Sequence, residues 1–457
     1  MTESTHLGTR NLTIIVTASL AGLLFGFDTV VMSGVTQSLR DVFHLEPGSW
    51  WFGFAVASAL FGTTLGAMFA GIPGDALGSR DSLKAVGFLY VISAVGSALC
   101  WSLPSFYVFR FIGGLAIGAS SVLAPVYISE IAPANRRGAL TGLFQFNIVF
   151  GILLAYVSNF VVQWLAGDFD AWRWKLGVAA VPAFVFLLLM YTIPQSPRWL
   201  SLRGREAEAK ASLERLGVAD TAGMLAEFAR AANEARAAAA HVLFSARYSR
   251  PILLAILLAM FNQLSGINAI LYYLNDIFAA AGFDKMSSDL QAIAIGAANL
   301  IATMIALRVI DRFGRKKLLL IGAVGTAVAQ AGVALIMGSG QGNEYLLAML
   351  IMFIAFFAFS QGAVIWVYLA EIFPTAVRAR GQALGSTTHW LMNALIATVF
   401  PMIAAKAHGV PFAFFAACMV VQFFVVLAVF PETRGVELES MDKAIEKTSE
   451  KKSGAAA

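Results

Sequence analysis

The sequence predicts an all-α integral membrane protein of about twelve transmembrane helices, arranged as two six-helix bundles. Three observations support this. Of the 457 residues, 59% are hydrophobic and only 13% are charged, whereas soluble domains are roughly 45–50% apolar. Apolar windows of about 20 residues, the length a helix needs to cross the hydrocarbon, recur along the chain. The two halves of the chain also repeat one another.

The repeat consists of three pairs of short motifs that occur in the same order in both halves. The members of each pair lie roughly 240 residues apart, and so large an offset in a membrane protein indicates the two halves of a transporter fold. The pairs are Asp75-Ala-Leu-Gly78-Ser-Arg80 with Asp311-Arg-Phe-Gly314-Arg-Lys316, Glu130-Ile-Ala-Pro133 with Glu371-Ile-Phe-Pro374, and Pro194-Gln-Ser-Pro-Arg198 with Pro431-Glu-Thr-Arg434.

Four segments follow from this repeat: an N-terminal bundle (1–193), a cytoplasmic linker (194–250), a C-terminal bundle (251–435) and a charged tail (436–457). The linker is rich in alanine and in alternating charges, which predicts short amphipathic helices. The expected spans are Leu12–Gly34, Trp50–Ile72, Lys84–Ser102, Ser105–Ile131, Ala139–Val162, Trp174–Ile193, Pro251–Ala279, Leu290–Ile310, Leu318–Met337, Tyr345–Ile372, Gln382–Ile403 and Val410–Phe430.

Basic residues gather in alternate loops, and this pattern predicts that both termini and the linker are cytoplasmic, in a cell-membrane protein. Membrane orientation explains the net charge of +5 better than nucleic-acid binding does, so the lipid bilayer is the expected partner. The first apolar run is too long for a signal-peptide core and is read as the first span. Cys100 and Cys418 lie in separate apolar runs, which argues against a disulfide or a metal site. No cofactor is expected.

Ionisable groups inside the spans are few and costly, so each is a functional candidate. Asp28 lies roughly 10 Å below the outer surface, counted at 1.5 Å per residue. Arg110 enters the fourth span from the outside and reaches a similar depth, so we expect the two to pair. A titratable carboxylate beside a cavity suits proton coupling, and a static ion pair is the alternative. Glu130 and Glu371 lie at cytoplasmic span ends, where pairing with Arg136, Arg378 or Arg315 is expected.

Uncharged polar groups interrupt the seventh span at Asn262-Gln263-Leu-Ser265-Gly266-Ile-Asn268. Gly266 is expected to loosen the helix there, as in the discontinuous helices of transporters. Carboxamides both donate and accept hydrogen bonds without charge, which suits a neutral polyhydroxyl ligand, and aromatic rings can stack on a sugar. Hydrogen bonding between helices is the alternative, favoured for Asn147. Further polar or aromatic candidates within the spans are Gln145, Asn147, Asn299, Trp366, His389, Trp390 and Asn393.

Six motifs in order make the chain resemble the sugar porter family of the major facilitator superfamily, over nearly its whole length. They are Phe25-Gly-Phe-Asp28-Thr29, Arg110-Phe-Ile-Gly-Gly-Leu-Ala-Ile-Gly118, Pro125-Val-Tyr127-Ile-Ser-Glu130, Pro194-Gln-Ser-Pro-Arg198, Gln263-Leu-Ser-Gly-Ile-Asn268 and Pro431-Glu-Thr-Arg434-Gly435.

The resemblance implies the major facilitator fold, alternating access and a sugar site built mostly by the second half. It implies that Asp28 and Arg110 serve proton coupling, because proton-coupled members carry Asp at the first-span position. The sugar site that the resemblance implies comprises Gln145, Asn262, Gln263, Asn268, Asn299 and Trp366, and Phe25, His389 and Asn393 are further candidates for sugar contact. The inner gate would comprise Asp75, Arg80, Glu130, Arg137, Asp311, Arg315, Glu371 and Arg378.

The chain departs from the family pattern at four positions. Asn262 replaces a common glutamine, and Ala363 replaces a proline that favours bending of the tenth span. His389 stands where Gln or Asn is usual, and Ser79 replaces an arginine of the first gate motif.

The sequence thus predicts a proton-coupled symporter of a hexose or pentose that functions as a monomer. A sugar uniporter of the same fold is the nearest alternative. A sugar sensor that does not transport is a more distant one. A membrane enzyme is not expected, because the spans hold no metal cluster or nucleophile–base pair.

Overall fold

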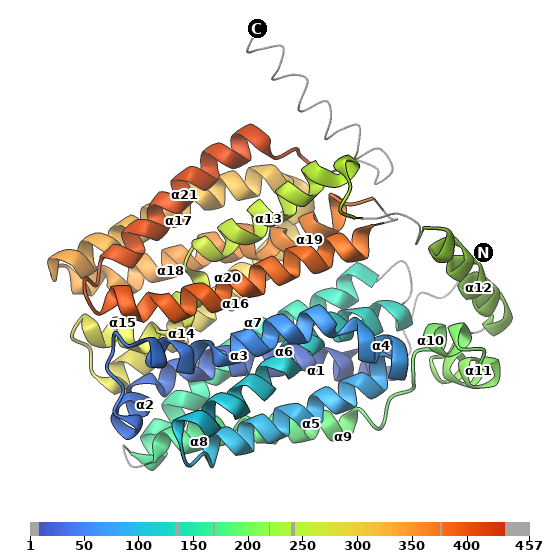
Figure 1. Ribbon diagram of the computed structural model, residues 1–457, viewed down its shortest axis with the longest axis horizontal. Coiled ribbons are helices and arrows are strands. Elements are labelled where there is room, and N and C mark those ends of the chain that lie inside the picture. The colour runs from blue at the N-terminus through green and yellow to red at the C-terminus, as the bar shows by residue number, and fades with distance from the viewer. Residues whose placement is uncertain are drawn as a thin grey trace, which may run out of the picture. The chain divides into compact units, whose positions relative to one another are not determined.

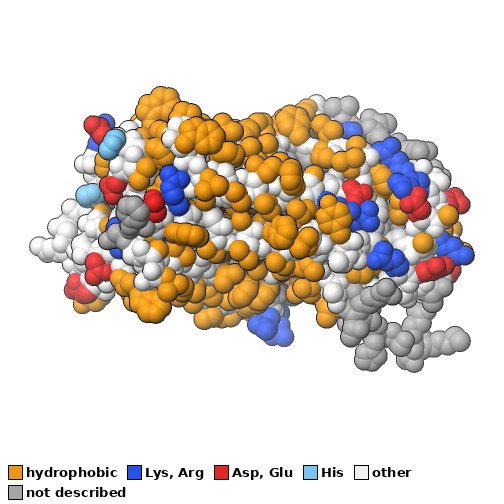
Figure 2. Space-filling view, turned by 90° about the horizontal axis from the view of Figure 1, so that it is seen from below, with side chains coloured by type: hydrophobic (Ala, Val, Ile, Leu, Met, Phe, Trp, Pro, Cys, Tyr) orange, Lys and Arg blue, Asp and Glu red, His pale blue; other side chains and the backbone are white. Residues whose placement is uncertain are grey.

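The computed structural model describes residues 9–132, 137–167, 170–218, 220–238, 243–374 and 377–434. Within these ranges the chain is helical and contains no strand, which confirms the predicted all-α membrane fold. Ten segments of the described chain are long and apolar enough to cross a membrane. On the face shown in Figure 2, hydrophobic side chains cover the middle of the helices and charged side chains gather towards their ends.

The two remaining expected spans correspond to helices α5 (Ser79–Ala98) and α20 (Arg378–Ala404). They have 20 and 27 residues, and about 20 residues suffice to span the hydrocarbon. Their charged first turns and, in α20, the polar residues His389 and Asn393 lower their hydropathy. Both polar side chains of α20 are buried within the protein, where they face no lipid.

Contacts between residues divide the chain into two compact units (Figure 1). Unit 1 comprises Met1–Thr29, Gly62–Ala155 and Arg173–Ala237, and unit 2 comprises Val30–Phe61, Tyr156–Trp172 and Ala238–Ala457. Parts of the first half of the chain therefore belong to unit 2. Helices α1, α3, α7, α8 and α12 each run from one unit into the other.

Unit 1 contains five long helices and the short helices that follow them. Figure 1 shows α10 and α11 next to α4, beyond the N-terminal end of α5. The elements are α1 (Thr9–Val31), the second part of α3 (Trp50–Phe69), α4 (Gly71–Leu77), α5, α6 (Leu103–Ile131), α7 (Arg137–Ala166), α8 (Ala171–Gly177), α9 (Ala180–Leu189), α10 (Pro197–Leu202), α11 (Glu206–Arg215) and α12 (Thr221–Ala238).

Unit 2 contains the helices of the second half together with short segments of the first. The elements that lie wholly in it are η1 (Met32–Gly34), α2 (Thr36–Phe43), η3 (Ala246–Tyr248), α13 (Ser249–Leu264), α14 (Ile267–Tyr272), α15 (Leu274–Ala280), α16 (Lys285–Phe313), α17 (Arg315–Ser339), η4 (Asn343–Tyr345), α18 (Leu346–Phe357), the π-helix η5 (Ala358–Gly362), α19 (Ala363–Glu371), α20 and α21 (Val410–Val429).

Local sequence explains where several of these helices begin. Ser102 and Ser105 form a reciprocal capping box at the start of α6, with a proline in the first turn. Asp284 accepts a hydrogen bond from the backbone N–H of Ser287 at the start of α16. Gly78 and Gly314 precede α5 and α17 with φ of 81° and 85°, a conformation that favours glycine. The two halves therefore use the same turn at matching positions.

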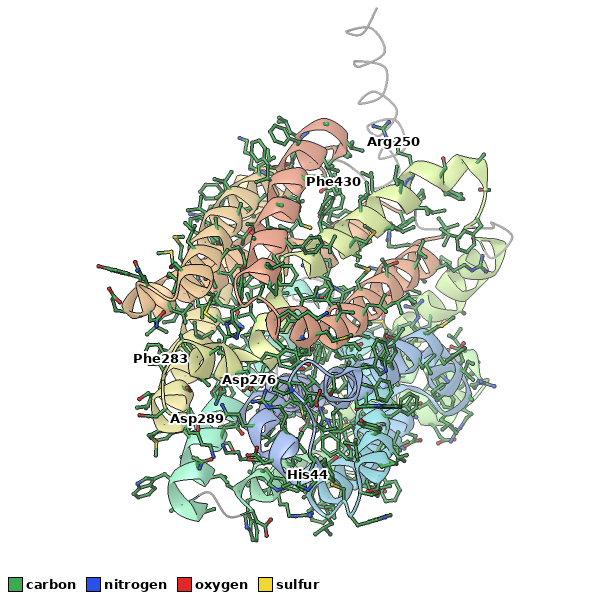
Figure 3. All side chains as sticks on the ribbon, turned by 60° about the vertical axis from the view of Figure 1, so that its left-hand side comes forward. His44, Arg250, Asp276, Phe283, Asp289 and Phe430 are labelled. Atoms are coloured by element: carbon green, nitrogen blue, oxygen red, sulfur yellow. The ribbon has the colours of Figure 1, made fainter. Side chains whose placement is uncertain are left out.

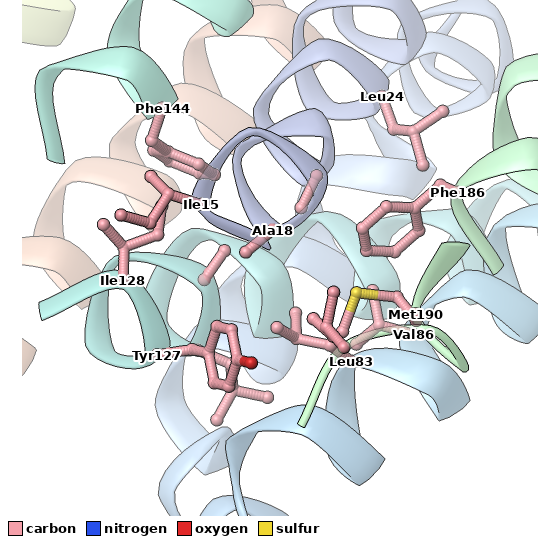
Figure 4. Packing of buried hydrophobic residues seen from close by; sticks show 14 of the residues in the cluster. Ile15, Ala18, Leu24, Leu83, Val86, Tyr127, Ile128, Phe144, Phe186 and Met190 are labelled. Atoms are coloured by element: carbon pink, nitrogen blue, oxygen red, sulfur yellow. The ribbon is translucent and has the colours of Figure 1, made fainter. Parts of the chain in front are cut away.

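The core of unit 1 brings together side chains from five helices. Figure 4 shows Ala18 of α1, Leu83 of α5, Tyr127 of α6, Phe144 of α7 and Phe186 of α9 among its members. A second cluster in unit 2 joins α13, α16, α17, α19 and the end of α21.

Glycines let helix backbones approach within unit 1, as they do in many membrane proteins. A Cβ at Gly26 of α1 would lie 1.9 Å from the carbonyl oxygen of Ile148, and a Cβ at Gly151 of α7 would lie 2.2 Å from that of Leu23. The two glycines therefore permit the crossing of α1 and α7 reciprocally. No flexible side chain can move aside there, because the opposing atoms are backbone.

We predict that Gly151→Leu lowers the thermal unfolding temperature of the purified protein in detergent, because overpacking a helix contact typically costs about 1–3 kcal/mol or more. Gly142→Leu on the same helix is the matched control, because nothing lies within 4 Å of a Cβ there. Equal unfolding temperatures for the two variants would contradict the close crossing of α1 and α7.

Candidate functional site

A break in the seventh span positions the first group of candidate residues. α13 ends at Leu264, and α14 begins at Ile267 after Gly266, whose φ is 82°. The predicted loosening of the helix at Gly266 is thus confirmed. Gln330 of α17 donates a hydrogen bond of 2.8 Å to the carbonyl oxygen of Ser265, which satisfies a backbone acceptor freed by the break.

The carboxamides around this break form a continuous hydrogen-bond network. Gln263 Nε2 donates to Asn262 Oδ1 at 3.2 Å, and Asn268 Nδ2 donates to Gln263 Oε1 at 3.0 Å. Gln263 Nε2 also lies 3.2 Å from Nδ1 and 3.1 Å from Nε2 of His389 on α20. Asn262 and Gln263 are 3% and 1% exposed. The structure therefore brings together four polar side chains from three helices, α13, α14 and α20, at one buried place.

Aromatic rings adjoin this network. The ring centres of Trp366 and Trp390 both lie 5.1 Å from that of His389. Trp390 is buried, whereas Trp366 on α19 is 39% exposed. The network thus has an accessible aromatic side chain beside it, which is the combination that binds sugar rings through hydroxyl hydrogen bonds and C–H stacking.

The tenth span contains a π-helix, η5, which the sequence analysis missed. It lies directly before Ala363, the position at which the family pattern has a proline. Asn262 Nδ2 donates to the carbonyl oxygen of Gln361, in η5, at 3.3 Å. π-bulges often occur at functional sites. The span is therefore irregular here even without a proline.

The other predicted members of the sugar site lie in different places. Asn393 of α20 is buried and donates to the Tyr272 hydroxyl at 3.1 Å. Asn299 is buried on α16. Gln145 on α7 and Phe25 on α1 belong to unit 1 and are half-buried there.

Asp28 and Arg110 form the ion pair that the sequence predicted, inside unit 1. Arg110 Nη1 donates to Asp28 Oδ1 at 2.7 Å, and Arg110 Nη2 lies 3.4 Å from the backbone oxygen of Asp28. Asp28 is 7% and Arg110 is 3% exposed. Asp28 Oδ2 and Arg110 Nε are buried without a hydrogen-bond partner. One carboxylate oxygen thus binds the guanidinium, and no hydrogen bond occupies the other.

Asn147 of α7 has the structural role that was favoured for it. Its amide donates to Ser19 Oγ at 2.8 Å and to its own helix at the carbonyl oxygen of Leu143. It therefore links α7 to α1 within unit 1.

A cluster of charged residues lies where α17 begins in unit 2. Arg315 binds Glu371 through two hydrogen bonds, Nε to Oε2 at 3.1 Å and Nη2 to Oε1 at 2.8 Å. Thr433 Oγ1 donates to Glu371 Oε2 at 2.6 Å. Glu432 accepts the backbone N–H groups of Arg315 and Lys316 at 2.8 and 3.1 Å, so its carboxylate caps the helix.

The matching place in unit 1 replaces charged groups with neutral ones. Ser79 occupies the position of Arg315, and its hydroxyl lies 3.4 Å from Glu130 Oε2. Gln195 takes the role of Glu432: its Oε1 accepts the backbone N–H of Arg80 at 3.2 Å, and its Nε2 donates to the Leu77 carbonyl at 3.0 Å. The contact of Ser79 with Glu130 in unit 1 is thus weaker than the contact of Arg315 with Glu371 in unit 2.

Arg80 itself does not reach Glu130 in the structure, because its guanidinium binds Asp81 through two hydrogen bonds of 3.0 and 3.2 Å. Asp81 also forms an ion pair with Lys84 at 2.9 Å. The exposed Asp75 uses its backbone oxygen, which accepts Trp199 Nε1 at 2.9 Å and a bond from Arg203.

Arg378 donates to the carbonyl oxygen of Phe373 at 3.2 Å. The side chains of Arg137 and Asp311, the other two predicted gate residues, lie outside the described part of the chain.

Sequence reasoning missed Gln330 and Gln361, which support the helix break and the π-helix. Both are glutamines within apolar runs and are buried, so the cost of a polar group inside a span was a usable signal. The sequence-based prediction also placed Arg80 in the gate but did not include Asp81 as its partner, although the two residues are adjacent in sequence.

Comparisons with known proteins show what the chain is similar to. The family model described as "Sugar (and other) transporter" matches residues 14–445. The chain is 34% identical to the D-xylose-proton symporter of Escherichia coli (strain K12), covering 96% of both chains. It is 33% identical to the arabinose-proton symporter of Bacillus subtilis (strain 168), covering 93% of both. The inward-open structure of the xylose transporter XylE from E. coli superposes with a TM-score of 0.85 at 33% identity, covering 95% of this chain and 99% of that one.

Proposed function

Because the chain belongs to the sugar transporter family, we propose that it is a proton-coupled symporter that carries a monosaccharide, a hexose or a pentose, across the cell membrane by alternating access. The named relatives are a D-xylose-proton symporter and an arabinose-proton symporter. Both termini and the linker face the cytoplasm in this proposal, because basic residues gather in the loops on that side.

The observation that carries proton coupling is the buried pair of Asp28 and Arg110. A carboxylate away from water prefers to be neutral unless a cation stays beside it. Any change of state that separates Arg110 from Asp28 therefore favours protonation of the carboxylate, and protonation in turn weakens the pair. The unpartnered oxygen of Asp28 gives the proton a place to bind. Proton binding and conformation are coupled in this way.

The carboxamide network with His389 and Trp366 is the proposed sugar site. In the structure, the polar groups of this network form hydrogen bonds with one another. Sugar hydroxyls would replace these hydrogen bonds one for one without burying a charge. We keep Asn299 and Asn393, and Gln145 and Phe25 in unit 1, as further proposed sugar contacts. Arg80 and Glu130 in unit 1, and Arg315 and Glu371 in unit 2, remain proposed inner-gate residues. Asp75, Arg137, Asp311 and Arg378 are proposed with them.

One chain carries both the proton-binding pair and the proposed sugar site. This supports the further proposal that the protein functions as a monomer.

We predict that Gln263→Ala weakens sugar binding by about 1–3 kcal/mol, because hydroxyl partners are left unmatched in a buried site. Isothermal titration of the purified variant with the transported sugar measures this. Gln341→Ala removes an exposed carboxamide of the same unit and serves as the control. An affinity equal to that of the control would place Gln263 outside the sugar site.

We predict that Asp28→Asn abolishes uphill sugar uptake but preserves exchange of labelled for unlabelled sugar. Asparagine copies the shape and neutrality of the protonated acid and cannot release a proton. The measurement compares uptake driven by an inward proton gradient with counterflow, in the same proteoliposomes, for a panel of pentoses and hexoses. Asp41→Asn, an exposed carboxylate, is the control.

Three outcomes of this experiment would contradict the proposal in different ways. Accumulation by Asp28→Asn at the level of the unaltered protein would remove Asp28 from the coupling mechanism. If the unaltered protein equilibrates sugar without accumulating it, it is a uniporter. If it moves no sugar of the panel although it binds one, it is a sensor.

A further inference from the structure

One end of unit 2 is closed by segments from both halves of the chain. Gly53 of α3 belongs to the first half, and a Cβ there would lie 2.0 Å from the carbonyl oxygen of Thr398 on α20. Phe52, beside it, meets the ring of Tyr273 edge-on at 5.8 Å, and Tyr273 stacks on Phe400 at 5.3 Å. We call these residues, together with Ala397, the outer seal: Phe52, Gly53, Tyr273, Ala397, Thr398 and Phe400.

The outer seal lies at the opposite end of unit 2 from the cluster of Arg315 and Glu371. In Figure 3, Asp276 and Asp289 lie at one end of the unit and Arg250 and Phe430 at the other. α16 joins the two ends with 29 residues, roughly 40 Å of helix. The topology of the proposed function places the outer seal on the external side.

An ion pair also connects first-half and second-half segments beside the outer seal. Arg40 of α2 and Asp276 of α15 approach to 3.0 Å, with side chains 22% and 16% exposed. Both carboxylate oxygens of Asp276 are buried. The guanidinium of Arg40 also lies over the ring of Phe52, 5.0 Å from its centre. The pair therefore joins a first-half segment to the second half at the edge of the outer seal.

The surroundings of the pair favour opening at this contact. A cavity of about 230 Å³ adjoins it, lined by Arg40, Phe52, Tyr273, Asp276 and His408 among others. Because one side of the pair faces this cavity, the two side chains can separate without disrupting a close-packed core.

Asp276 lies on α15, a helix of seven residues that is separate from α14. Tyr273, which separates α14 from α15, has φ −108° and ψ 19°, outside the helical range. Asn275, next to Asp276, donates to Asp289 of α16 at 2.5 Å. α15 is thus tied to α16 on one side and held to α2 by a separable ion pair on the other.

We propose that Arg40 and Asp276 are gating residues of the transport cycle, whose ion pair holds the outer seal shut and breaks each time the protein opens to the outside. This inference rests on the proposed alternating access. Breaking the pair by neutralising one partner leaves the other charge partly buried and uncompensated, which favours the open state, where water reaches it. Restoring opposite charges in either order restores the closed state.

The test measures how often the outer seal opens, without requiring sugar transport. The parent variant for this test carries Cys100→Ala and Cys418→Ala, so that neither of the two native cysteines can react with the thiol reagent. Ala397→Cys then places one thiol inside the seal, where Ala397 is fully buried and its carbonyl accepts the Tyr273 hydroxyl at 2.8 Å. A membrane-impermeant methanethiosulfonate, added outside right-side-out vesicles, labels this thiol only when the seal opens.

In this background, Arg40→Gln and Asp276→Asn should each raise the labelling rate about tenfold, an effect between those of an exposed and a fully buried ion pair. The exchange of charges, Arg40→Asp with Asp276→Arg, should return the rate towards that of the parent. Lys406→Gln removes an exposed charge that directly follows Ala405, a residue lining the cavity, and should change nothing. Elution of each variant as a single peak in size-exclusion chromatography confirms that it is folded.

Parent-like labelling in both single variants would overturn the proposal. So would fast labelling that the exchanged pair fails to slow, because packing rather than charge would then hold the seal. A failure of sugar uptake in the unaltered protein would instead contradict the proposed function and would leave these labelling rates readable.

Discussion

The structure depends above all on one constraint of the hydrocarbon: every backbone N–H and C=O group inside it needs a partner within the protein. Regular helices meet this need, and glycines let them cross closely, as Gly26 and Gly151 do. Departures from the regular helix are therefore informative. Two departures in the described second half, at Gly266 and at η5, adjoin the same carboxamide network. Gln330 supplies the partner that the first break requires.

The same need for partners explains how the charged groups are paired. Inside unit 1 a single carboxylate is balanced by a single guanidinium, and no hydrogen bond occupies its second oxygen. At the end where α17 begins, Arg315, Glu371, Glu432 and Thr433 satisfy one another through several bonds. The first group is the one that the proposed function assigns to proton coupling, because one oxygen of its carboxylate has no hydrogen-bond partner. The second suits a contact that forms and breaks as a whole, since its charges are shared among many partners.

The fold was readable from the sequence, but most of the side-chain partners were not. Periodic apolar windows and the repeated motifs predicted the spans, because hydrophobic length and internal symmetry are local or repeated signals. The pairing of Asp28 with Arg110 followed from helix depth alone. The roles of Gln195 and Glu432 as helix caps, the π-helix without a proline, and the pairing of Arg40 with Asp276 did not. Each depends on residues distant in sequence, whose approach is set by packing that no single motif encodes.

The central claim, that sugar and proton cross together, is tested most directly by following protons while sugar enters. Proteoliposomes of the unaltered protein, with equal pH on both sides and a pH-sensitive dye inside, receive xylose, arabinose or glucose from outside. The account predicts that a transported sugar acidifies the interior, and that a protonophore abolishes this change. Entry of labelled sugar at an unchanged internal pH would contradict it.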